Sequence, residues 1–450
     1  MSRDAAVDTA LNRLDDLLAK AREAGAAAAD AVMVDSVSIS HAQRLGEVER
    51  LERSEEADVG LRVLLGQKQA CVSSSDLAAA AMDELVERAI AMAKTVPDDP
   101  YCGLATGRML AAEWPDLDSD DPSEPSAETL IERARACEEA ARAVEGVTNS
   151  EGAEANWGRA HIALAASNGF RGGYTNSSHS VGGAVLAGEG TGMERDYAFH
   201  SAVYGSDLED PGVVGQRAGE RTVKRLNPRQ AKTGRYPVVY HPRVANSLLR
   251  ALSGAINGAA IARGTSFLKD SMEARVFAPG ITIVDDPHRA RGLRSKPFDA
   301  EGLPNKTRNI IDDGVLTSWI LSLSSARQLG LPSTGHAVRG TGAPPSAGPT
   351  NFYMAPGQSS PEDLMADIQE GFYVTEMMGQ GVNMVTGDYS RGAAGFWIEN
   401  GQIAYPVSEV TVAGNLKEMF ANLVPANDLE FRFGTDAPTV RIDGMTLAGS

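Results

Sequence analysis

The chain has 450 residues, of which 42% are hydrophobic and 23% are charged, and its formal net charge at pH 7 is −18. This composition is typical of a folded globular protein, and the length favours two or three domains over a single core. The acidic balance argues against nucleic acid or an anionic membrane surface as the main partner, because both repel a negatively charged protein.

The N-terminal segment predicts an amphipathic helix and does not resemble a targeting signal. Four leucines recur there at helical spacing between charged residues: Leu11, Leu14, Leu17 and Leu18. No apolar run of about 18 residues occurs in the sequence, so we expect no membrane helix. The cysteines are odd in number and far apart: Cys71, Cys102 and Cys137. This pattern indicates a reducing compartment, and we expect a cytoplasmic protein.

The first half predicts short strands followed by alternating helices and strands. Strands are expected at residues 30–39, 47–55, 58–65 and 67–73, joined at Gly46, Gly60 and Gly66. A helix capped by Ser75 or Asp76 runs to Pro97, and residues 97–125 form a Pro- and Asp-rich surface loop. A helix over 126–145, glycine-punctuated strands to Tyr204 and a helix over 213–226 complete this half.

The segment "NPRQAKTGR" predicts a linker, which places a domain boundary near residue 230. The sequence therefore predicts an α+β protein with two domains. Residues 1–229 form an N-terminal α/β domain with antiparallel strands and flanking helices, and residues 230–450 form a mostly β domain. The second domain opens with the strand "YPVVY" and a helix over 243–262, and Asn400-Gly401 marks a tight hairpin.

Familiar catalytic motifs are scarce. The seven histidines are scattered, and no H-E-x-x-H or Cys/His cluster occurs, although a zinc site built from remote histidines stays open. "SFLK", from Ser266 to Lys269, fits the S-x-x-K pattern of serine amidases, and "KTG" over 232–234 fits a second motif of those enzymes. Their order is reversed and no S-D-N lies between them, which weakens this hypothesis. "GEGTG" at 188–192 lacks the following Lys-Ser/Thr of a nucleotide-binding loop.

The C-terminal half carries the most specific signal. "GFYVTEMMGQGVNMVTGDYSRGAAGFWIENGQIAYPVSEVTVAGNLKEMF", residues 371–420, closely resembles the closing segment of the TldD/TldE (PmbA) peptidase family, in its TldE/PmbA-type branch. The resemblance extends to 265–271, to "NIIDDGVLTSWILS" at 309–322 and, more loosely, to the whole N-terminal half.

The resemblance implies a heterodimeric, cytoplasmic zinc metallopeptidase in which a TldD-type subunit holds the metal through an H-E-x-x-x-H helix and a later cysteine. In this chain the corresponding helix reads "LLRALSGAING", and the three functional positions fall on Arg250, Ala251 and Ala255. The cysteine position falls in "YVTEMM", which contains none. A guanidinium and two methyl groups cannot replace imidazoles and a general base. We therefore expect no catalytic residue and no cofactor in this chain, and zinc in a partner subunit.

The glycine-rich stretch 379–395 suggests a surface over which a peptide backbone could pass closely. The candidate peptide-binding residues are Gly379, Gln380, Gly381, Asn383, Asp388, Tyr389, Ser390 and Arg391. A structural role for this stretch, as a turn with Arg391 bridging to a carboxylate, is an equal alternative. The run "RGTGAPPSAGPTN", 339–351, predicts a cleft wall, a dimer contact or a disordered loop.

Together these observations predict a non-catalytic TldE/PmbA-type subunit, inactive alone, that pairs with a TldD-type metallopeptidase to process unstructured peptides. Extended peptides are the expected substrates, nucleic acid and membrane are not expected partners, and a homodimer stays open for the isolated chain. Two alternatives remain: a self-associating protein that binds peptides without cleaving them, and a serine amidase that uses Ser266 and Lys269.

Overall fold

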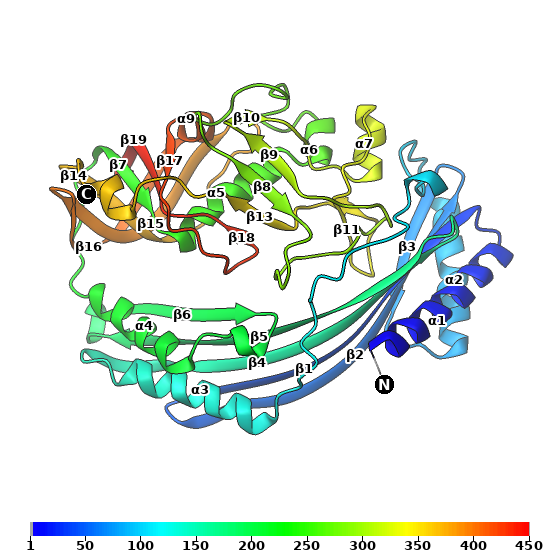
Figure 1. Cartoon of the computed structure of the whole chain (residues 1–450), viewed down its shortest axis with the longest axis horizontal. Helices are drawn as coiled ribbons and strands as arrows, with labels where there is room; N and C mark the ends of the chain where they lie inside the picture. The colour runs from blue at the N-terminus through cyan, green and yellow to red at the C-terminus, as the bar shows by residue number, and fades with distance from the viewer. Residues whose placement is uncertain (1–2, 450) are drawn as a thin grey trace.

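A computed structural model describes residues 3–449, and these form a mixed α+β fold, which confirms the predicted class. Figure 1 shows a long curved sheet, built from the first half of the chain, that cups a second body built from the second half. Within residues 3–449, no helix is both long and apolar enough to cross a membrane.

The N-terminal sheet has six strands in the order β3-β2-β1-β4-β5-β6, and every neighbouring pair is antiparallel. The strands are β1 (Ala28–Arg44), β2 (Glu47–Leu65), β3 (Lys68–Ser74), β4 (Val147–Ala166), β5 (Arg171–Ala187) and β6 (Glu194–Ala202). The four strands β1, β2, β4 and β5 are 17 to 20 residues long. Strand twist accumulates over such a length, and the sheet curves so that its concave face meets the second half (Figure 1).

Four helices cover the convex face of this sheet (Figure 1). They are α1 (Arg3–Glu23), α2 (Ala79–Thr95), α3 (Ala127–Arg142) and α4 (Pro211–Lys224), with short 3₁₀ turns at Gly107–Met109, Gly190–Gly192 and Gly205–Asp207. The helical leucines Leu11, Leu14 and Leu17 are buried against the sheet, as their spacing predicts. Helix α3 begins where expected, because the Ser126 hydroxyl accepts a hydrogen bond from the Thr129 N–H.

A ring of five strands forms the main core of the second half. They are β7 (Gly234–Tyr240), β14 (Glu370–Met378), β15 (Asp388–Glu399), β16 (Gln402–Asn415) and β19 (Val440–Ala448), and the pairing of β16 with β19 closes the ring. Strand β17 (Leu423–Pro425) adds to β19. Helix α5 (Pro242–Ala255) packs Leu248, Leu249 and Leu252 into the same core as Phe372 of β14.

A second, smaller sheet runs in the order β10-β9-β8-β13-β18. Its strands are β8 (Ile283–Asp286), β9 (Arg308–Asp312), β10 (Val315–Leu316), β13 (Asn351–Met354) and β18 (Thr435–Asp436), and β11 (Ala337–Val338) pairs separately with β12 (Ser346–Ala347). The remaining helices are α6 (Gly258–Ala262), α7 (Leu323–Leu329), α8 (Pro361–Met365) and α9 (Leu416–Ala421).

The Gly/Pro-rich run 339–351 packs on the chain's own N-terminal sheet. Arg339 forms an ion pair with Asp30 of β1 at 2.5 Å, and the two side chains are only 1% and 4% exposed. The Thr341 hydroxyl donates to a carboxylate oxygen of Asp58 at 3.0 Å. A Cβ on Gly60 of β2 would lie 2.1 Å from the Thr341 carbonyl oxygen. The run therefore joins the two halves, a contact within the chain that the sequence did not indicate.

Three sequence predictions need correction. The strands expected at 47–55 and 58–65 are one strand, β2, because Gly60 makes room for Thr341 and not for a turn. The helix expected over 243–262 is two helices: it ends at Ala255 and restarts where the Asn257 side chain accepts from the Ala259 N–H. Helix α2 begins at Ala79, three residues beyond Asp76, whose carboxylate instead accepts from the Ala78 N–H.

The hairpin at Asn400-Gly401 is confirmed, because both residues have positive φ, 49° and 80°, between β15 and β16. The chain passes from α4 to β7 within residues 225–233, around the predicted boundary near 230. The division into two folding units, 1–229 and 230–450, stays a prediction.

Candidate functional site

Helix α5 carries the three positions where the family resemblance places zinc-peptidase residues. Arg250 is exposed, Ala251 is half-buried and Ala255 is fully buried in the core. A guanidinium donates hydrogen bonds only and a methyl group offers no lone pair, so these side chains do not fit a zinc ion. Across residues 3–449, no three His, Cys, Asp or Glu side chains lie close enough together to hold a metal. That the protein binds no zinc stays a prediction.

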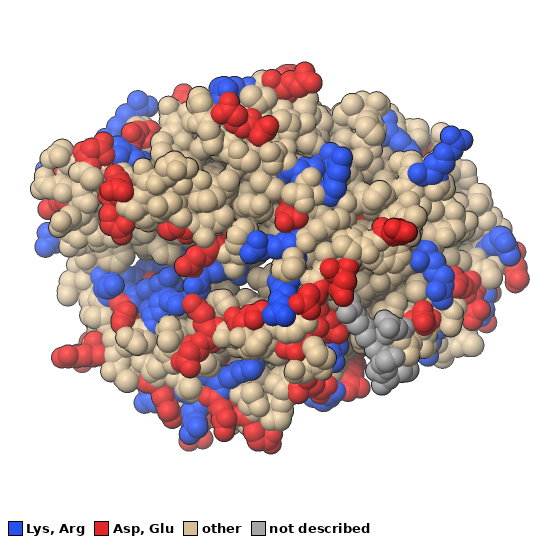
Figure 2. Space-filling model, viewed as in Figure 1, with Lys and Arg blue, Asp and Glu red and all other residues tan. Residues whose placement is uncertain are grey.

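The outer face of α5 lines a cavity of about 600 Å³ between the two halves of the chain. Arg243, Asn246 and Arg250 lie on this face at spacings of three and four residues, and they all line the cavity. The facing wall is formed by α4 and β6. Figure 2 shows the molecule hollowed between its two halves, with Lys and Arg atoms gathered beside the hollow over α4 and β6.

Ion pairs hold the two walls of this cavity together. Arg243 of α5 donates two hydrogen bonds, at 2.7 and 3.0 Å, to the carboxylate of Asp196 on β6. Burial opposes ionisation of Asp196, but the bonds and charge of Arg243 prevail and hold its pKa below the usual range. Arg217 and Arg432 likewise share Glu209, and the bond from Arg217 is the main reason that the Glu209 pKa falls to about 2. These carboxylates therefore stay charged at neutral pH.

His241 lines the cavity and lies immediately before α5. Its Nδ1 accepts a hydrogen bond from the Arg243 N–H and so caps the helix. Burial, followed by the positive charges of Arg221 and Arg243, lowers the His241 pKa to about 3. The imidazole is therefore neutral at physiological pH.

The glycine-rich stretch forms a loop, residues 379–387, between β14 and β15. A Cβ on Gly381 would lie 1.5 Å from the Ser390 carbonyl oxygen, so only glycine fits there. Asn383 accepts hydrogen bonds from backbone N–H groups inside the loop, and Asp388 accepts from Thr386 and Asn415. Arg391 donates from Nε to the carbonyl oxygen of Gly379 at 3.1 Å. The expected bridge from Arg391 thus exists, but it ends on a backbone carbonyl and not on a carboxylate.

The predicted peptide-binding residues do not all face solvent. Gly379, Gln380, Asn383, Asp388 and Ser390 are exposed, and Gly381 and Arg391 are partly exposed. Tyr389 is 3% exposed and belongs to the main core of the second half. This is a correction, because alternate residues of β15 point inward and Tyr389 takes an inward position. Peptide contact by the others stays a prediction.

The structure places this loop beside α5. The Phe267 N–H donates to the Met384 carbonyl oxygen, and a Cβ on Gly254 would lie 3.2 Å from Cε of Met384. The loop therefore borders the C-terminal end of α5, while the cavity borders the part of the helix from Pro242 to Arg250. Sequence reasoning found the loop through its glycines but missed the cavity, because the arginines that line it are widely separated in the chain.

Ser266 and Lys269 do not form a catalytic pair. Ser266 is 2% exposed, and its hydroxyl donates to the Ala255 carbonyl oxygen at 2.6 Å while accepting from the Leu268 N–H. Lys269 is exposed. A buried hydroxyl whose proton is bound to a backbone carbonyl is not poised for attack on a substrate, and this geometry offers the amidase hypothesis no support.

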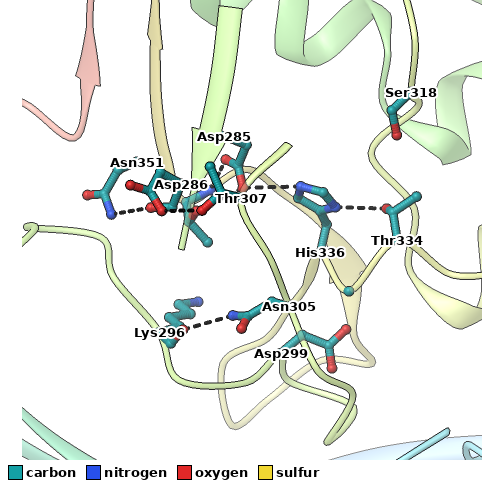
Figure 3. A network of polar contacts seen from close by, with 12 residues as sticks. Asp285, Asp286, Lys296, Asp299, Asn305, Thr307, Ser318, Thr334, His336 and Asn351 are labelled. Atoms are coloured by element: carbon teal, nitrogen blue, oxygen red, sulfur yellow. Dashed lines mark hydrogen bonds and ion pairs between the residues drawn. The ribbon is translucent and has the colours of Figure 1, made fainter. Parts of the chain in front are cut away.

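A buried polar network around β8 has the residue types of a hydrolase triad (Figure 3). His336 lies between Asp285, 3.1 Å from its Nε2, and Thr334, 2.8 Å from its Nδ1. The Thr334 hydroxyl oxygen accepts from the Leu321 N–H, and Asp285 also accepts two bonds from Thr350. Asp285 and His336 are only 1% and 3% exposed. The network therefore ties chain segments together and has no open side for a substrate.

Models of one protein family match three segments of the chain. Residues 233–449 match the PmbA/TldA metallopeptidase C-terminal domain, residues 120–226 the central domain and residues 29–93 domain 1 of the same family. The chain therefore belongs to the PmbA/TldD metallopeptidase family.

Its relatives include metalloprotease PmbA of Escherichia coli O157:H7, which is 40% identical over 99% of this chain and 95% of that protein. A metalloprotease PmbA homolog of Haemophilus influenzae is 35% identical over 96% of this chain and 94% of that protein. A metalloprotease TldD homolog of Buchnera aphidicola is 26% identical over 50% of each chain.

Solved structures share the fold over nearly the full length. A crystal structure of a proposed modulator of DNA gyrase from Bacteroides thetaiotaomicron superposes with a TM-score of 0.90 at 26% identity, covering 98% of each chain. TldE from Thermococcus kodakarensis has a TM-score of 0.85 at 19% identity and covers 97% of this chain and 100% of that one. At that identity the second likeness concerns the fold alone.

Proposed function

We propose that this chain is the non-catalytic, TldE/PmbA-type subunit of a zinc metallopeptidase, and that a TldD-type partner supplies the metal. The chain shapes the peptide-binding space of the complex and is inactive alone. Its substrates are unstructured peptides, because a folded chain cannot enter a cleft between two subunits. Three free cysteines agree with a reducing, cytoplasmic location.

The observation that carries the proposal is the state of α5. The family resemblance assigns Arg250, Ala251 and Ala255 to the positions of the metal-binding helix of TldD-type subunits, and none of these side chains can hold zinc or act as a general base. The helix nevertheless keeps its place, with its apolar side in the core and its outer side on the cavity. A fold retained around a site without metal ligands favours a partner role over independent hydrolysis.

Co-purification tests the partnership. The full chain, co-expressed with a tagged TldD-type protein from the same genome, should elute as one complex, and light scattering should give a mass for both chains together. The same chain without that partner should not cleave an extended peptide. A chain that elutes alone or as a homodimer in the presence of the partner, while still binding peptides, would instead establish the self-associating peptide-binding protein.

A further inference from the structure

We propose that the cavity between α4, β6 and α5 binds the carboxylate of an extended peptide, with Arg221 of α4 and Arg250 of α5 as the groups that hold it. The inference rests on the proposed function, because it assigns a class of peptide substrate to this chain. It concerns binding by this chain alone, so it can be tested without the partner.

Arg221 differs from the arginines one turn away on the same helix. Arg217 is paired with Glu209, and Arg225 is paired with Glu194 and Glu376. Arg221 lies between them and lines the cavity, yet within residues 3–449 it has neither a hydrogen bond nor an ion pair. A half-buried guanidinium is ordinarily paired, because its five N–H donors lose water on burial. Arg221 therefore presents unused donors to the cavity.

Arg221 lies among other arginines on this wall of the cavity. Burial is the largest cause that lowers the Arg221 pKa, to about 10, and the guanidinium groups of Arg243, Arg217 and Arg432 lower it further against the opposing charge of Asp196. The same positive field helps to keep His241 neutral. An anion placed beside Arg221 would relieve this repulsion, and a guanidinium binds a carboxylate through two parallel hydrogen bonds.

Arg250 adds a second unpaired guanidinium on the α5 wall, since it too forms no ion pair with any residue that the structure describes. Most carboxylates of the lining are already bonded: Asp428 to Thr439, Glu430 to Arg432 and Asp436 to backbone N–H groups. Glu362 alone among the lining carboxylates of residues 3–449 has no such bond. The lining holds five arginines and four carboxylates, and of these arginines Arg221 and Arg250 have no carboxylate partner among residues 3–449, so an anion can bind beside these two although the whole chain is acidic.

Aromatic side chains give the cavity room for more than a small anion. Tyr197 and Phe199 of β6 are stacked with their ring centroids 6.2 Å apart, and Phe433 lies 5.6 Å from Phe199. Tyr197 and Phe199 remain more than a third exposed. Strand β6 is also the last strand of its sheet, and such an edge can pair with an extended peptide. Rings beside a cation suit an apolar peptide segment that ends in, or contains, a carboxylate.

Calorimetric titration of the full chain with three acetylated peptides of one Ala/Phe sequence tests the site. One peptide ends in a free carboxylate, one in an amide, and one is amidated but contains a single glutamate. We expect at least one acid peptide to bind about tenfold more tightly than the amide, because a charge-assisted pair is lost in the amide. The acid peptide that binds more tightly shows whether the site takes a terminal carboxylate or a side-chain carboxylate. Equal binding of all three would overturn the proposal.

Two variants localise the effect. Arg221→Gln should remove the preference for the acid peptide, whereas Lys224→Gln, which removes the same charge from an exposed position of the same helix, should keep it. Arg221→Gln should also melt no lower than the parent chain, because no bond is lost. An unchanged preference in Arg221→Gln, or a sharp fall in its melting temperature, would contradict the assignment. Inorganic phosphate that binds as tightly as the acid peptide would show a small-anion site and overturn the peptide ligand.

Discussion

Arg339 and Asp30 form a buried ion pair that joins the second half of the chain to the first strand of the N-terminal sheet. Asp30 is also bonded to Arg62 of β2, so one carboxylate lies between two guanidinium groups. Burial alone would raise the Asp30 pKa, but the charges of Arg62 and Arg339 outweigh it and hold that pKa below its usual value. The carboxylate is therefore ionised and lies between two buried cations.

Asp30→Asn should destabilise the protein by about 3–5 kcal/mol, because removing one partner leaves buried charge uncompensated. Urea unfolding of the full chain measures the change. Lys20→Met is the matched control: it breaks an ion pair with Asp83 whose side chains are 38% and 60% exposed, and we expect a cost below about 1 kcal/mol. Similar losses in the two variants would mean that the Arg62–Asp30–Arg339 group contributes no more than a surface pair.

Glu301 predicts a pH dependence of stability. Burial is the main cause that raises its pKa to about 7, and the charge of Asp299 adds to it. Between the ordinary glutamate pKa of 4.5 and about 7, the folded chain holds a proton that the unfolded chain has lost. The contribution of Glu301 to the free energy of unfolding is therefore fully present below that pH window and is lost as the pH rises through it. The loss is at most about 3 kcal/mol, because one pKa unit corresponds to about 1.4 kcal/mol.

Glu301→Gln should remove this dependence, because a neutral amide can still accept the hydrogen bond from the Leu323 N–H. The variant should gain stability over the parent chain at pH 8 and gain little at pH 5, as read by thermal melting at both values. Glu84→Gln, at an exposed position of α2, serves as the control. A gain in Glu301→Gln that is as large at pH 5 as at pH 8 would show that ionisation of Glu301 is not its cause.

Substitution of Arg391 tests whether the glycine-rich loop contributes to peptide processing. We expect Arg391→Ala to lower kcat/KM of the reconstituted complex by about tenfold to a hundredfold, the effect of losing one charge-assisted hydrogen bond of about 1.5–3 kcal/mol. The variant should still fold and pair, because Arg391 is partly exposed and its bond reaches only the loop residue Gly379. A large drop in melting temperature with loss of pairing would make Arg391 a structural bridge, and unchanged kinetics would make the loop a surface turn.

Ser266→Ala tests the alternative that this chain is a serine amidase. The hydroxyl holds the segment after α6 to the end of α5 through the Ala255 carbonyl, so its removal should cost about 1 kcal/mol of stability. Activity of the complex should stay within a few-fold of the parent. Loss of a true serine nucleophile costs on the order of a million-fold in kcat, and a collapse of that size with pairing intact would revive the amidase.

The sequence predicts local features of this fold better than its long-range contacts. Ser126 as a helix cap and Asn400-Gly401 as a turn follow from chemistry within a few residues, and both are found. Gly60 was predicted to separate two strands, but a glycine is needed there because Thr341, which is far away in the sequence, approaches it closely. Tyr389 was expected at the surface beside polar neighbours, yet strand alternation turns it into the core.

The cavity could not be predicted for the same reason. Arg217 and Arg221 are only four residues apart on one helix, but Arg250 and Arg432 reach the cavity from other parts of the chain. Nothing local distinguishes the unpaired Arg221 from the paired Arg217, because the difference is where Glu209 lies in space. In contrast, the resemblance to a known family predicts that Arg250, Ala251 and Ala255 lie on one helix, and all three lie on α5.

We propose that this chain contributes no metal centre and acts through a zinc-bearing partner. The most direct measurement is elemental analysis, with a peptide-cleavage assay, of this chain alone, the TldD-type partner alone and the reconstituted pair. We predict no stoichiometric zinc and no cleavage for this chain alone, and about one zinc per pair with full activity in the complex. This proposal is wrong if the isolated chain holds about one zinc, loses it when a single histidine is substituted, and cleaves the peptide without the partner.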